Sequence, residues 1–465
     1  MGPLSLSFEF PSLPSHCSYL KSPQLGPTST ATMTRSPTFL TMLLLLFFFF
    51  IWCPNGGNGA VLLPLRKQRL PRESYSLLST SDELRFHHNV SLTVSVTVGS
   101  PPQAVTMVLD TGSELSWLRC KAAGGLNFIF NSSASRSYTK IPCSSPTCRF
   151  KSRDLTIPVS CNAANLCHAV VSYADSTYLE GTLAYETFRF GSVTRRATAF
   201  GCMDSGYTSN PAEDSTTTGL MGMNRGAMSF VSQMGLKKFS YCISGIDSSG
   251  VLLLGNASLP WLTPLRYTPL VRMDLPLPYF NRVAYSVLLQ GINVDGQPLT
   301  LSAAAYEPDH TGAGQTMVDS GTQFTYLLGP VYTALRNEFL SKTKGILRVL
   351  DEPNFVFQGA MDLCYLLPSN SESLPALPQV TMAFHGAEMN VAREKILYKV
   401  PGEFRGNDAV WCFTFGNSDL AGSEAFVIGH HHQQDLWMEF DLEGNRIGIA
   451  ETSCDVASRK LGLGF

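Results

Sequence analysis

The sequence predicts a mostly β, bilobal fold with a central cleft between two related lobes. Short segments of alternating apolar and polar residues, rich in β-branched side chains, recur between turn residues, as in 90–96 and 283–289. This period of two is typical of strands. The 38 Gly and 28 Pro suit a fold with many turns. One stretch, 330–343, begins with a proline and predicts a helix.

An internal repeat predicts the two lobes. Residues 108–118, VLDTGSELSWL, reappear as residues 317–327, MVDSGTQFTYL, with side chains of the same class at nearly every position. An apolar-apolar-Gly segment follows each copy, at 220–222 and 427–429. Each lobe should therefore carry one acidic loop and one apolar-apolar-Gly segment.

Four regions are expected along the chain. The apolar run 39–52 follows Arg35 and precedes small residues up to Ala60, which is typical of a cleaved signal peptide. A retained signal anchor is the alternative, but we expect no stable membrane anchor after cleavage. The regions are a signal peptide with an N-terminal extension (1–60), a short pro-segment or linker (61–84), an N-terminal lobe (85–265) and a C-terminal lobe (266–465).

Composition favours an exported, globular, monomeric protein. Hydrophobic residues make up 44% of the chain and charged residues 15%, and the net charge of -2 gives no reason to expect a nucleic-acid partner. Ten cysteines follow the signal, an even number that suggests disulfides in a secreted chain. No pair has the CxxC spacing of a zinc site, so no metal or cofactor is expected. Three sequons predict N-glycosylation, at Asn89, Asn131 and Asn256.

The two acidic loops supply a pair of carboxyl groups, Asp110 and Asp319. Like charges at close range push the two proton affinities apart, so one carboxyl is ionised and the other neutral. Such a pair can act as general base and general acid in the hydrolysis of a peptide bond by water. Gly112 and Gly321 would let the two backbones approach one shared site.

Hydroxyl residues beside the two aspartates suit the same task. Thr111 and Ser320 are expected to hydrogen-bond between the lobes and hold the loops in register. Ser113 and Thr322 are expected to donate hydrogen bonds to the outer carboxylate oxygens. A single Asp-Thr-Gly is more often an ordinary turn, but two copies in matching apolar settings favour a catalytic pair.

The chain resembles the pepsin-like aspartic proteases, in particular their plant nucellin- and nepenthesin-like branch and, within it, the promotion-of-cell-survival type. The match runs from about Arg85 to Cys454 and includes the motifs at 110–117, 319–322 and 440–450. The resemblance implies a pepsin-like fold and an endopeptidase that cleaves polypeptides at acidic pH. It also implies inhibition by pepstatin-type compounds.

The resemblance further implies a β-hairpin flap over the cleft. Tyr173 and Asp175 match the flap residues of the family, and Trp117 matches the aromatic residue that hydrogen-bonds the flap tyrosine. Relatives usually carry Tyr-Gly-Asp-Gly-Ser. Here Ala174 replaces the first glycine and the second is absent, which puts flap mobility and substrate preference in doubt. The alternatives are a core tyrosine and a buried tryptophan with another partner.

Spacing alone leaves the disulfide connectivity open. The resemblance implies the pairs Cys120–Cys202, Cys143–Cys167, Cys148–Cys161, Cys242–Cys454 and Cys364–Cys412. Relatives often carry Asn-Phe-Gln-Gln near His430, His431 and His432, so a structural role is favoured there over metal binding.

Two functional alternatives remain beside an active protease. Some relatives are catalytically silent binding or inhibitor proteins, and a carbohydrate-binding β protein would leave the paired acidic loops unexplained. The basic run 66–72 suggests a zymogen in which this run pairs with an acidic cleft. The expected location is the endoplasmic reticulum lumen or the extracellular space, with the vacuole as an alternative.

Overall fold

The computed structural model describes residues 60–70, 88–121, 129–246, 250–273, 275–370 and 373–463. The expected signal peptide and residues 71–87 lie outside these ranges, apart from Ala60 itself. The described residues belong to one compact unit that begins at Asn58. No helix among them is long and apolar enough to cross a membrane.

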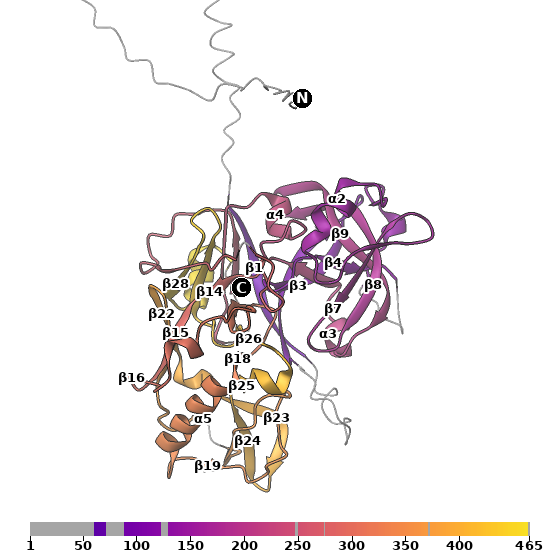
Figure 1. Cartoon of the computed structure of the whole chain (residues 1–465). Coiled ribbons are helices and arrows are strands. Elements are labelled where there is room, and N and C mark those ends of the chain that lie inside the picture. The colour runs from indigo at the N-terminus through magenta and orange to yellow at the C-terminus, as the bar shows by residue number, and fades with distance from the viewer. Residues whose placement is uncertain are drawn as a thin grey trace, which may run out of the picture. The chain divides into compact units, whose positions relative to one another are not determined.

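Most of the first half of the chain forms one 15-stranded sheet, which also takes in strands from the end of the chain (Figure 1). Its strands, in spatial order, are β13 (Arg266–Pro269), β28 (Arg446–Glu451), β27 (Leu436–Asp441), β11 (Lys238–Cys242), β12 (Gly250–Leu254), β1 (Val61–Arg69), β2 (Val90–Val98), β3 (Gln103–Asp110), β10 (Gly219–Gly222), β4 (Trp117–Arg119), β9 (Val193–Tyr207), β8 (Tyr178–Phe190), β7 (Cys167–Ser172) and β6 (Ser160–Cys161), with β5 (Thr139–Lys140) paired to β8.

The second half forms three smaller sheets, so the fold is mostly β and bilobal, as predicted. These sheets are β14 (Ser286–Val287), β17 (Gln315–Val318), β26 (Ala425–Ile428), β18 (Thr325–Leu327) and β25 (Phe415–Asn417); β16 (Gln297–Pro298), β15 (Leu289–Val294), β21 (Val380–Phe384) and β22 (Ala387–Val391); and β19 (Arg348–Val349), β20 (Cys364–Pro368), β24 (Asp408–Phe413) and β23 (Leu397–Arg405). The α-helices are α2 (Pro146–Arg149), α3 (Pro211–Asp214), α4 (Phe230–Met234), α5 (Gly329–Thr343) and α6 (Cys454–Lys460).

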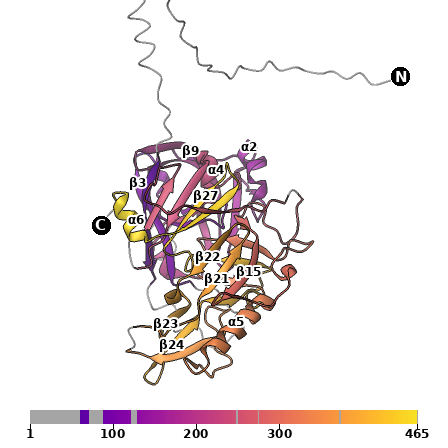
Figure 2. The ribbon, with the colours of Figure 1, turned by 90° about the vertical axis from the view of Figure 1, so that its left-hand side faces the viewer.

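The predicted helix is confirmed as α5, which lies on the outside of the second lobe beside β15 (Figure 2). Its inward face buries Val331, Leu335 and Phe339, spaced four residues apart as one face of a helix requires. The expected strand 283–289 is wrong over its first three residues. Regular pairing starts only at β14, and the Val283 carbonyl instead accepts from the backbone N–H of Arg225.

Strand β1 belongs to the large sheet, and this corrects the expected start of the globular part near Arg85. Residues 61–65 pair with β12 and residues 66–69 pair with β2. Leu63 and Leu65 are buried, and this alternation was obscured by the basic residues around it. None of residues 60–70 lines the cleft, and the Lys67 ammonium donates to the carbonyls of Ser244 and Gly245 at 3.3 Å.

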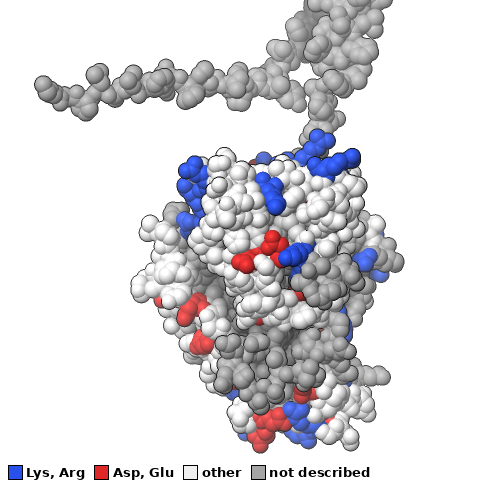
Figure 3. Space-filling view, turned by 90° about the vertical axis from the view of Figure 1, so that its right-hand side faces the viewer, with Lys and Arg blue, Asp and Glu red and all other residues white. Residues whose placement is uncertain are grey.

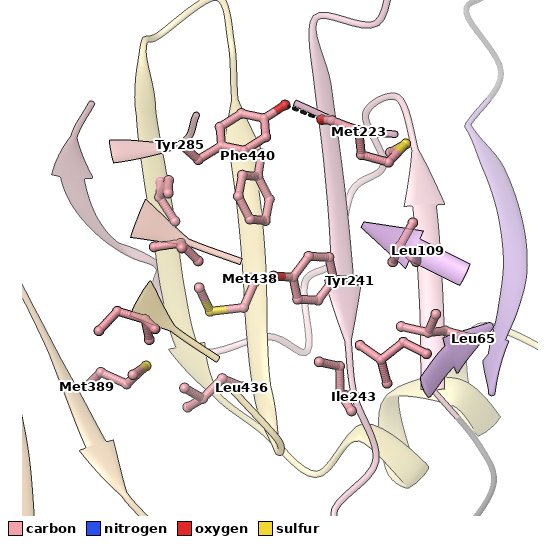
Figure 4. Close-up of a cluster of buried hydrophobic side chains, with 14 of the residues drawn as sticks. Leu65, Leu109, Met223, Tyr241, Ile243, Tyr285, Met389, Leu436, Met438 and Phe440 are labelled. Carbon is pink, nitrogen blue, oxygen red and sulfur yellow. Dashed lines mark hydrogen bonds between the residues drawn. The ribbon is translucent and has the colours of Figure 1, made fainter. Parts of the chain in front are cut away.

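Aromatic packing joins the two halves of the chain. Strand β11 of the first half pairs with β27 near the C-terminus, so that Phe239 and Phe440 stack with ring centroids 4.6 Å apart. Tyr285 meets Phe440 edge-on at 4.6 Å, and its hydroxyl donates to the Met223 carbonyl at 2.7 Å (Figure 4). Burial of these rings holds the lobes against each other.

The two repeats fold in the same way. Strand β10 runs parallel to β3 and antiparallel to β4, with Gly222 opposite Asp110. Strand β26 likewise runs parallel to β17 and antiparallel to β18, with Ile428 opposite Val318. Each apolar-apolar-Gly segment thus pairs with both arms of an acidic loop, which fixes where that loop points.

The surface carries few charges. On the face shown in Figure 3, basic and acidic side chains form small groups, some of one sign and some mixed, separated by uncharged surface. A mixed, sparsely charged face of this kind gives no extended field of one sign.

The structure contains three of the five expected disulfides and corrects the other two. Cys120–Cys202, Cys242–Cys454 and Cys364–Cys412 are present. The remaining pairs are Cys143–Cys161 and Cys148–Cys167, so the nested pairing is wrong. Cys148 and Cys167 are buried in one apolar cluster, whereas Cys161 is exposed and Cys143 half-buried. Burial therefore sorts the four cysteines into an inner and an outer pair.

These two disulfides offer a matched test of the fold. They close loops of nearly equal length, 18 and 19 residues, so each should constrain the unfolded chain by about 3 kcal/mol. Cys148→Ala with Cys167→Ala should cost about 1–2 kcal/mol more than Cys143→Ala with Cys161→Ala, because only the inner pair leaves a cavity. Denaturant unfolding of the two double variants measures the difference. Equal midpoints would contradict the burial argument.

Candidate active site

The two acidic loops meet at one point between the lobes. A Cβ added at Gly112 would lie 2.8 Å from Oδ1 of Asp319, and one added at Gly321 would collide with the Asp110 carboxylate. Each loop therefore packs its glycine against the aspartate of the other loop. A larger residue at either glycine would separate the two carboxyl groups.

The first loop binds its own carboxylate. The backbone N–H groups of Gly112 and Ser113 donate to Oδ1 of Asp110 at 2.8 and 3.2 Å. The Ser113 hydroxyl donates to Oδ2. Donors on both oxygens fix the orientation of a side chain that is only 6% exposed.

The second loop repeats this arrangement. The Gly321 N–H donates to Oδ1 of Asp319 at 2.8 Å, and the Thr322 hydroxyl donates to Oδ2 at 2.6 Å. Gln433 links this loop to β11: its Nε2 donates to the Asp319 carbonyl at 3.2 Å, and its Oε1 accepts from the Tyr241 hydroxyl. Gln433 was not singled out from the sequence; its signal is its position four residues after Gly429.

Thr111 and Ser320 lock the two loops together. The Thr111 N–H donates to the Ser320 Oγ at 3.0 Å, and the Ser320 N–H donates to the Thr111 Oγ1 at 2.9 Å. Each hydroxyl also donates across to the other strand, Thr111 to the Val318 carbonyl at 3.2 Å and Ser320 to the Leu109 carbonyl at 2.9 Å. Both side chains are fully buried, so the four bonds exclude water.

Burial and the neighbouring charge hold a proton in the pair. Desolvation, followed by the nearby Asp319 carboxylate, raises the pKa of Asp110 to about 8 against the donors from Ser113 and Gly112. The pair therefore keeps one proton and one negative charge from acidic to neutral pH. A general acid and a general base then stand side by side.

A cleft of about 930 Å³ lies over the two carboxyl groups, with both lobes in its walls. Its lining residues come from both lobes, and a hollow of this size has room for several residues of a polypeptide substrate. Residues that line it include Asp110, Tyr173, Asp175, Tyr279, Asp319 and Gln358.

Tyr173 lies at the turn between β7 and β8, at the edge of the cleft. The Trp117 Nε1–H donates to its hydroxyl at 2.6 Å. Asp175 closes the turn by accepting from the Thr177 N–H at 2.9 Å. Ser176, which stands where relatives carry the second glycine, has φ 70°, a left-handed conformation that costs a serine about 1 kcal/mol. Ser176 thus adopts the left-handed backbone conformation that glycine adopts most easily.

The cleft also holds charged residues that the sequence analysis missed. His88, Arg119, Glu213 and Asp214 line it close to the Tyr173 hairpin. They come from three separate segments, and only Arg119 adjoins a recognised motif. No local sequence signal could have brought them together.

The three adjacent histidines are buried and hydrogen-bonded inside the protein. Among the described residues, no group of three His, Cys, Asp or Glu side chains is arranged to hold a metal ion. The ring contacts are His430 with the Val90 carbonyl (3.3 Å), His431 with the Lys395 carbonyl (3.0 Å), and His432 with the Thr325 and Thr414 hydroxyls (2.7 and 2.8 Å).

One of the three sequons is wrong as a glycosylation site. Asn89 is 5% exposed, and its Nδ2 donates to the Tyr398 hydroxyl at 2.8 Å while its Oδ1 accepts from Gln323 at 2.7 Å. A glycan would require the loss of these contacts. Asn131 and Asn256 are exposed.

Comparison with known proteins places the chain among described families. A family model named xylanase inhibitor N-terminal matches residues 92–256, and one named xylanase inhibitor C-terminal matches residues 284–451. The chain is 57% identical to aspartic proteinase PCS1 of Arabidopsis thaliana over 411 residues, which cover 87% of this chain and 90% of that protein.

More distant similarities extend this result. The chain is 30% identical to aspartic proteinase nepenthesin-2 of Nepenthes gracilis, over 78% of this chain and 77% of that protein. A crystal structure of edgp superposes with a TM-score of 0.62 at 19% identity, over 86% of this chain and 96% of that one. At this identity the likeness concerns the fold alone.

The buried histidines predict a loss of stability in acid. Burial lowers the pKa of His430 and His432 to about 3 and that of His431 well below its usual 6.5. Above about pH 6.5 these histidines are neutral in both the folded and the unfolded chain, so they cost the folded protein no stability there. As the pH falls towards 3, the unfolded chain binds protons that the folded chain does not, at a cost of up to about 1.4 kcal/mol per pH unit and histidine.

His431→Phe tests this, because the ring packs against Phe324 and Tyr398 with centroids 5.1 and 5.8 Å away. The acid slope of the unfolding free energy should flatten by about a third. The exposed His310→Gln is the control and should leave the slope unchanged. An unaltered acid slope in His431→Phe would contradict the buried neutral ring.

Proposed function

The chain belongs to the pepsin-like family of aspartic endopeptidases, and we propose that Asp110 and Asp319 together activate the water that hydrolyses its polypeptide substrates. The observation that carries this proposal is the mutual packing of the two loops, in which each glycine abuts the aspartate of the other. The shared proton and the cleft above the pair support it.

The reaction needs no group beyond the two carboxyls and water. The ionised carboxylate takes a proton from a water molecule, whose oxygen attacks the peptide carbonyl carbon, while the protonated carboxyl gives its proton to the carbonyl oxygen. The tetrahedral intermediate then collapses: the C–N bond breaks, one carboxyl gives its proton to the nitrogen, and a hydroxyl group of the intermediate returns a proton to the other carboxylate. The products are a carboxylic acid and an amine, and the pair again holds one proton.

The hairpin that carries Tyr173 is proposed to act as the flap. The Trp117 bond positions the tyrosine hydroxyl at the cleft edge. Closure of such a hairpin over a bound chain excludes water and aligns the peptide bond with the pair. The left-handed Ser176 and the donors to Asp175 favour a well-defined turn.

We expect activity in mildly acidic to neutral solution, with inhibition by pepstatin-type compounds. Below pH 8 the raised pKa of Asp110 keeps the shared proton in place. In strong acid, protonation of the buried histidines in the unfolded chain lowers the stability of the folded protein, because burial holds the pKa of His430 and His432 at about 3. The working range is therefore bounded on the acidic side by stability and on the basic side by loss of the proton.

The proposed location is the secretory pathway, with the endoplasmic reticulum lumen, the extracellular space and the vacuole as destinations. Five disulfides among the described residues suit an oxidising compartment. The apolar run within residues 1–60 is the proposed signal peptide, and Asn131 and Asn256 are the proposed glycan sites. We propose a monomer.

A catalytically silent inhibitor is the competing function, because both family models carry the xylanase inhibitor name. A catalytically silent protein would not need two carboxylates that are each oriented by hydrogen-bond donors. Hydrolysis that pepstatin blocks separates the two functions.

Replacement of either aspartate should abolish hydrolysis. Asp110→Asn and Asp319→Asn should each lower kcat/KM for an unfolded protein substrate by about a thousandfold, because each removes one of the two proton-transfer groups. The full chain from a secreting eukaryotic host, assayed with and without pepstatin, provides the measurement. Asp351→Asn, an exposed carboxylate, is the matched control. Activity that survives in either active-site variant would contradict the proposal.

A further inference from the structure

Two ion pairs lie in the wall of the cleft that includes Tyr173. Helix α3 carries Glu213 and Asp214, and Arg119 lies two residues beyond Trp117 in β4. His88 Nε2 lies 2.9 Å from Oε1 of Glu213, and Arg119 forms an ion pair with Asp214. All four residues line the cleft.

The two pairs differ in their access to a ligand. Arg119 and Asp214 are 8% and 3% exposed, so they form the base of the wall. His88 and Glu213 are 21% and 18% exposed and form its surface. Oε1 of Glu213 is occupied by His88 and the Ser91 hydroxyl, while no described residue donates to Oε2. Glu213 lines the cleft, so a donor group of a substrate can reach its carboxylate.

Asp175 adds a carboxylate to the same place. Its oxygens accept from Thr177, whose hydroxyl lies 3.0 Å away, and from the Ser209 hydroxyl at 2.7 Å, and no cation pairs with it among the described residues. The neighbouring Asn210 donates its Nδ2 to the His88 carbonyl at 3.0 Å. The segment 209–210 thus joins Asp175 to the His88 pair.

The balance of charge on this wall is negative. Two cationic side chains, His88 and Arg119, face three carboxylates, Asp175, Glu213 and Asp214. Burial alone would raise the pKa of Glu213, but the charge and hydrogen bond of His88 hold it below its usual value, so the group stays ionised in acid. The single negative charge shared by the catalytic pair lies in the same cleft.

Such a wall favours a cationic side chain over an apolar one. An apolar group placed against it would strip water from the ion pairs and offer no hydrogen bond in return. An ammonium or guanidinium group would instead donate further hydrogen bonds to the carboxylates of Glu213 and Asp175, while its methylene stem packs against the aromatic rings of Tyr173 and Trp117.

We propose that this wall is a specificity subsite that binds a lysine or arginine side chain of the polypeptide substrate, with Glu213 and Asp175 as its acceptors. The proposal rests on the proteolytic function argued above. His88 and Arg119 act as positioning residues that hold Glu213 and Asp214 in place.

The test is a set of matched peptides cleaved by the full, secreted chain. Lysine, norleucine or glutamate is placed at each position in turn on both sides of the scissile bond. Norleucine keeps the methylene stem of lysine without its charge. At one position, kcat/KM should be about tenfold higher for lysine than for norleucine, the size expected of one charge-assisted hydrogen bond, and lowest for glutamate.

Two variants assign this preference to the wall. Glu213→Gln and Asp175→Asn should each bring the lysine-to-norleucine ratio at that position towards one, and the ratio corrects for any general loss of rate. Glu443→Gln removes an exposed carboxylate outside the cleft, where it pairs with Lys237, and should keep the ratio. Thermal unfolding shows whether each variant is folded. If Glu213→Gln does not fold, the lysine-to-norleucine ratio of Asp175→Asn tests the subsite.

The outcomes separate the subsite from the protease. Pepstatin-blocked cleavage with no lysine preference at any position would overturn the subsite and leave the protease intact. A preference that persists in both variants would also overturn it. Absence of cleavage of every peptide and of unfolded protein would contradict both proposals.

Discussion

The buried exchange of hydrogen bonds between Thr111 and Ser320 is the constraint on which the active site depends. The two residues belong to different lobes, and their hydroxyls and backbone N–H groups form four bonds in a place that water cannot reach. Buried polar groups that are fully satisfied specify one geometry, because any displacement leaves donors without partners. That geometry brings Asp110 and Asp319 close enough to share a proton.

Electrostatics then set opposing demands on the protein. The raised pKa of Asp110 suits catalysis but costs stability as the pH rises through the acidic and neutral range, whereas the buried histidines cost stability as the pH falls. Burial also raises the pKa of Glu114, in the first loop, to about 7, which adds to this cost as the pH rises from about 4.5 to about 7. The two effects act over overlapping parts of the acidic to neutral range, where they oppose each other. The ion pairs of His88 and Arg119 place further charge in the cleft without an isolated buried ion.

The sequence predicted what depends on local pattern. The repeat identified both acidic loops and their glycine segments, because each is a contiguous motif with one residue class per position. The pairing of Cys148 with Cys167 depends on which cysteines face the core, and Leu65 depends on a strand partner, Gly250, that lies 185 residues away in the sequence. The contact of His88 with Glu213 joins segments 125 residues apart. Contacts of this kind follow from the folded chain and leave no periodic trace in the sequence.

The most direct test of the account is a double-mutant cycle on the lock between the lobes. Thr111→Val and Ser320→Ala, alone and together, are compared by kcat/KM on one peptide, with unfolding measured beside it. Each single variant should lose about 10²-fold or more in kcat/KM, and the double variant should lose little beyond either, because the first change already releases the loops. Small, independent losses that simply multiply would contradict the claim that this exchange of hydrogen bonds holds the catalytic pair.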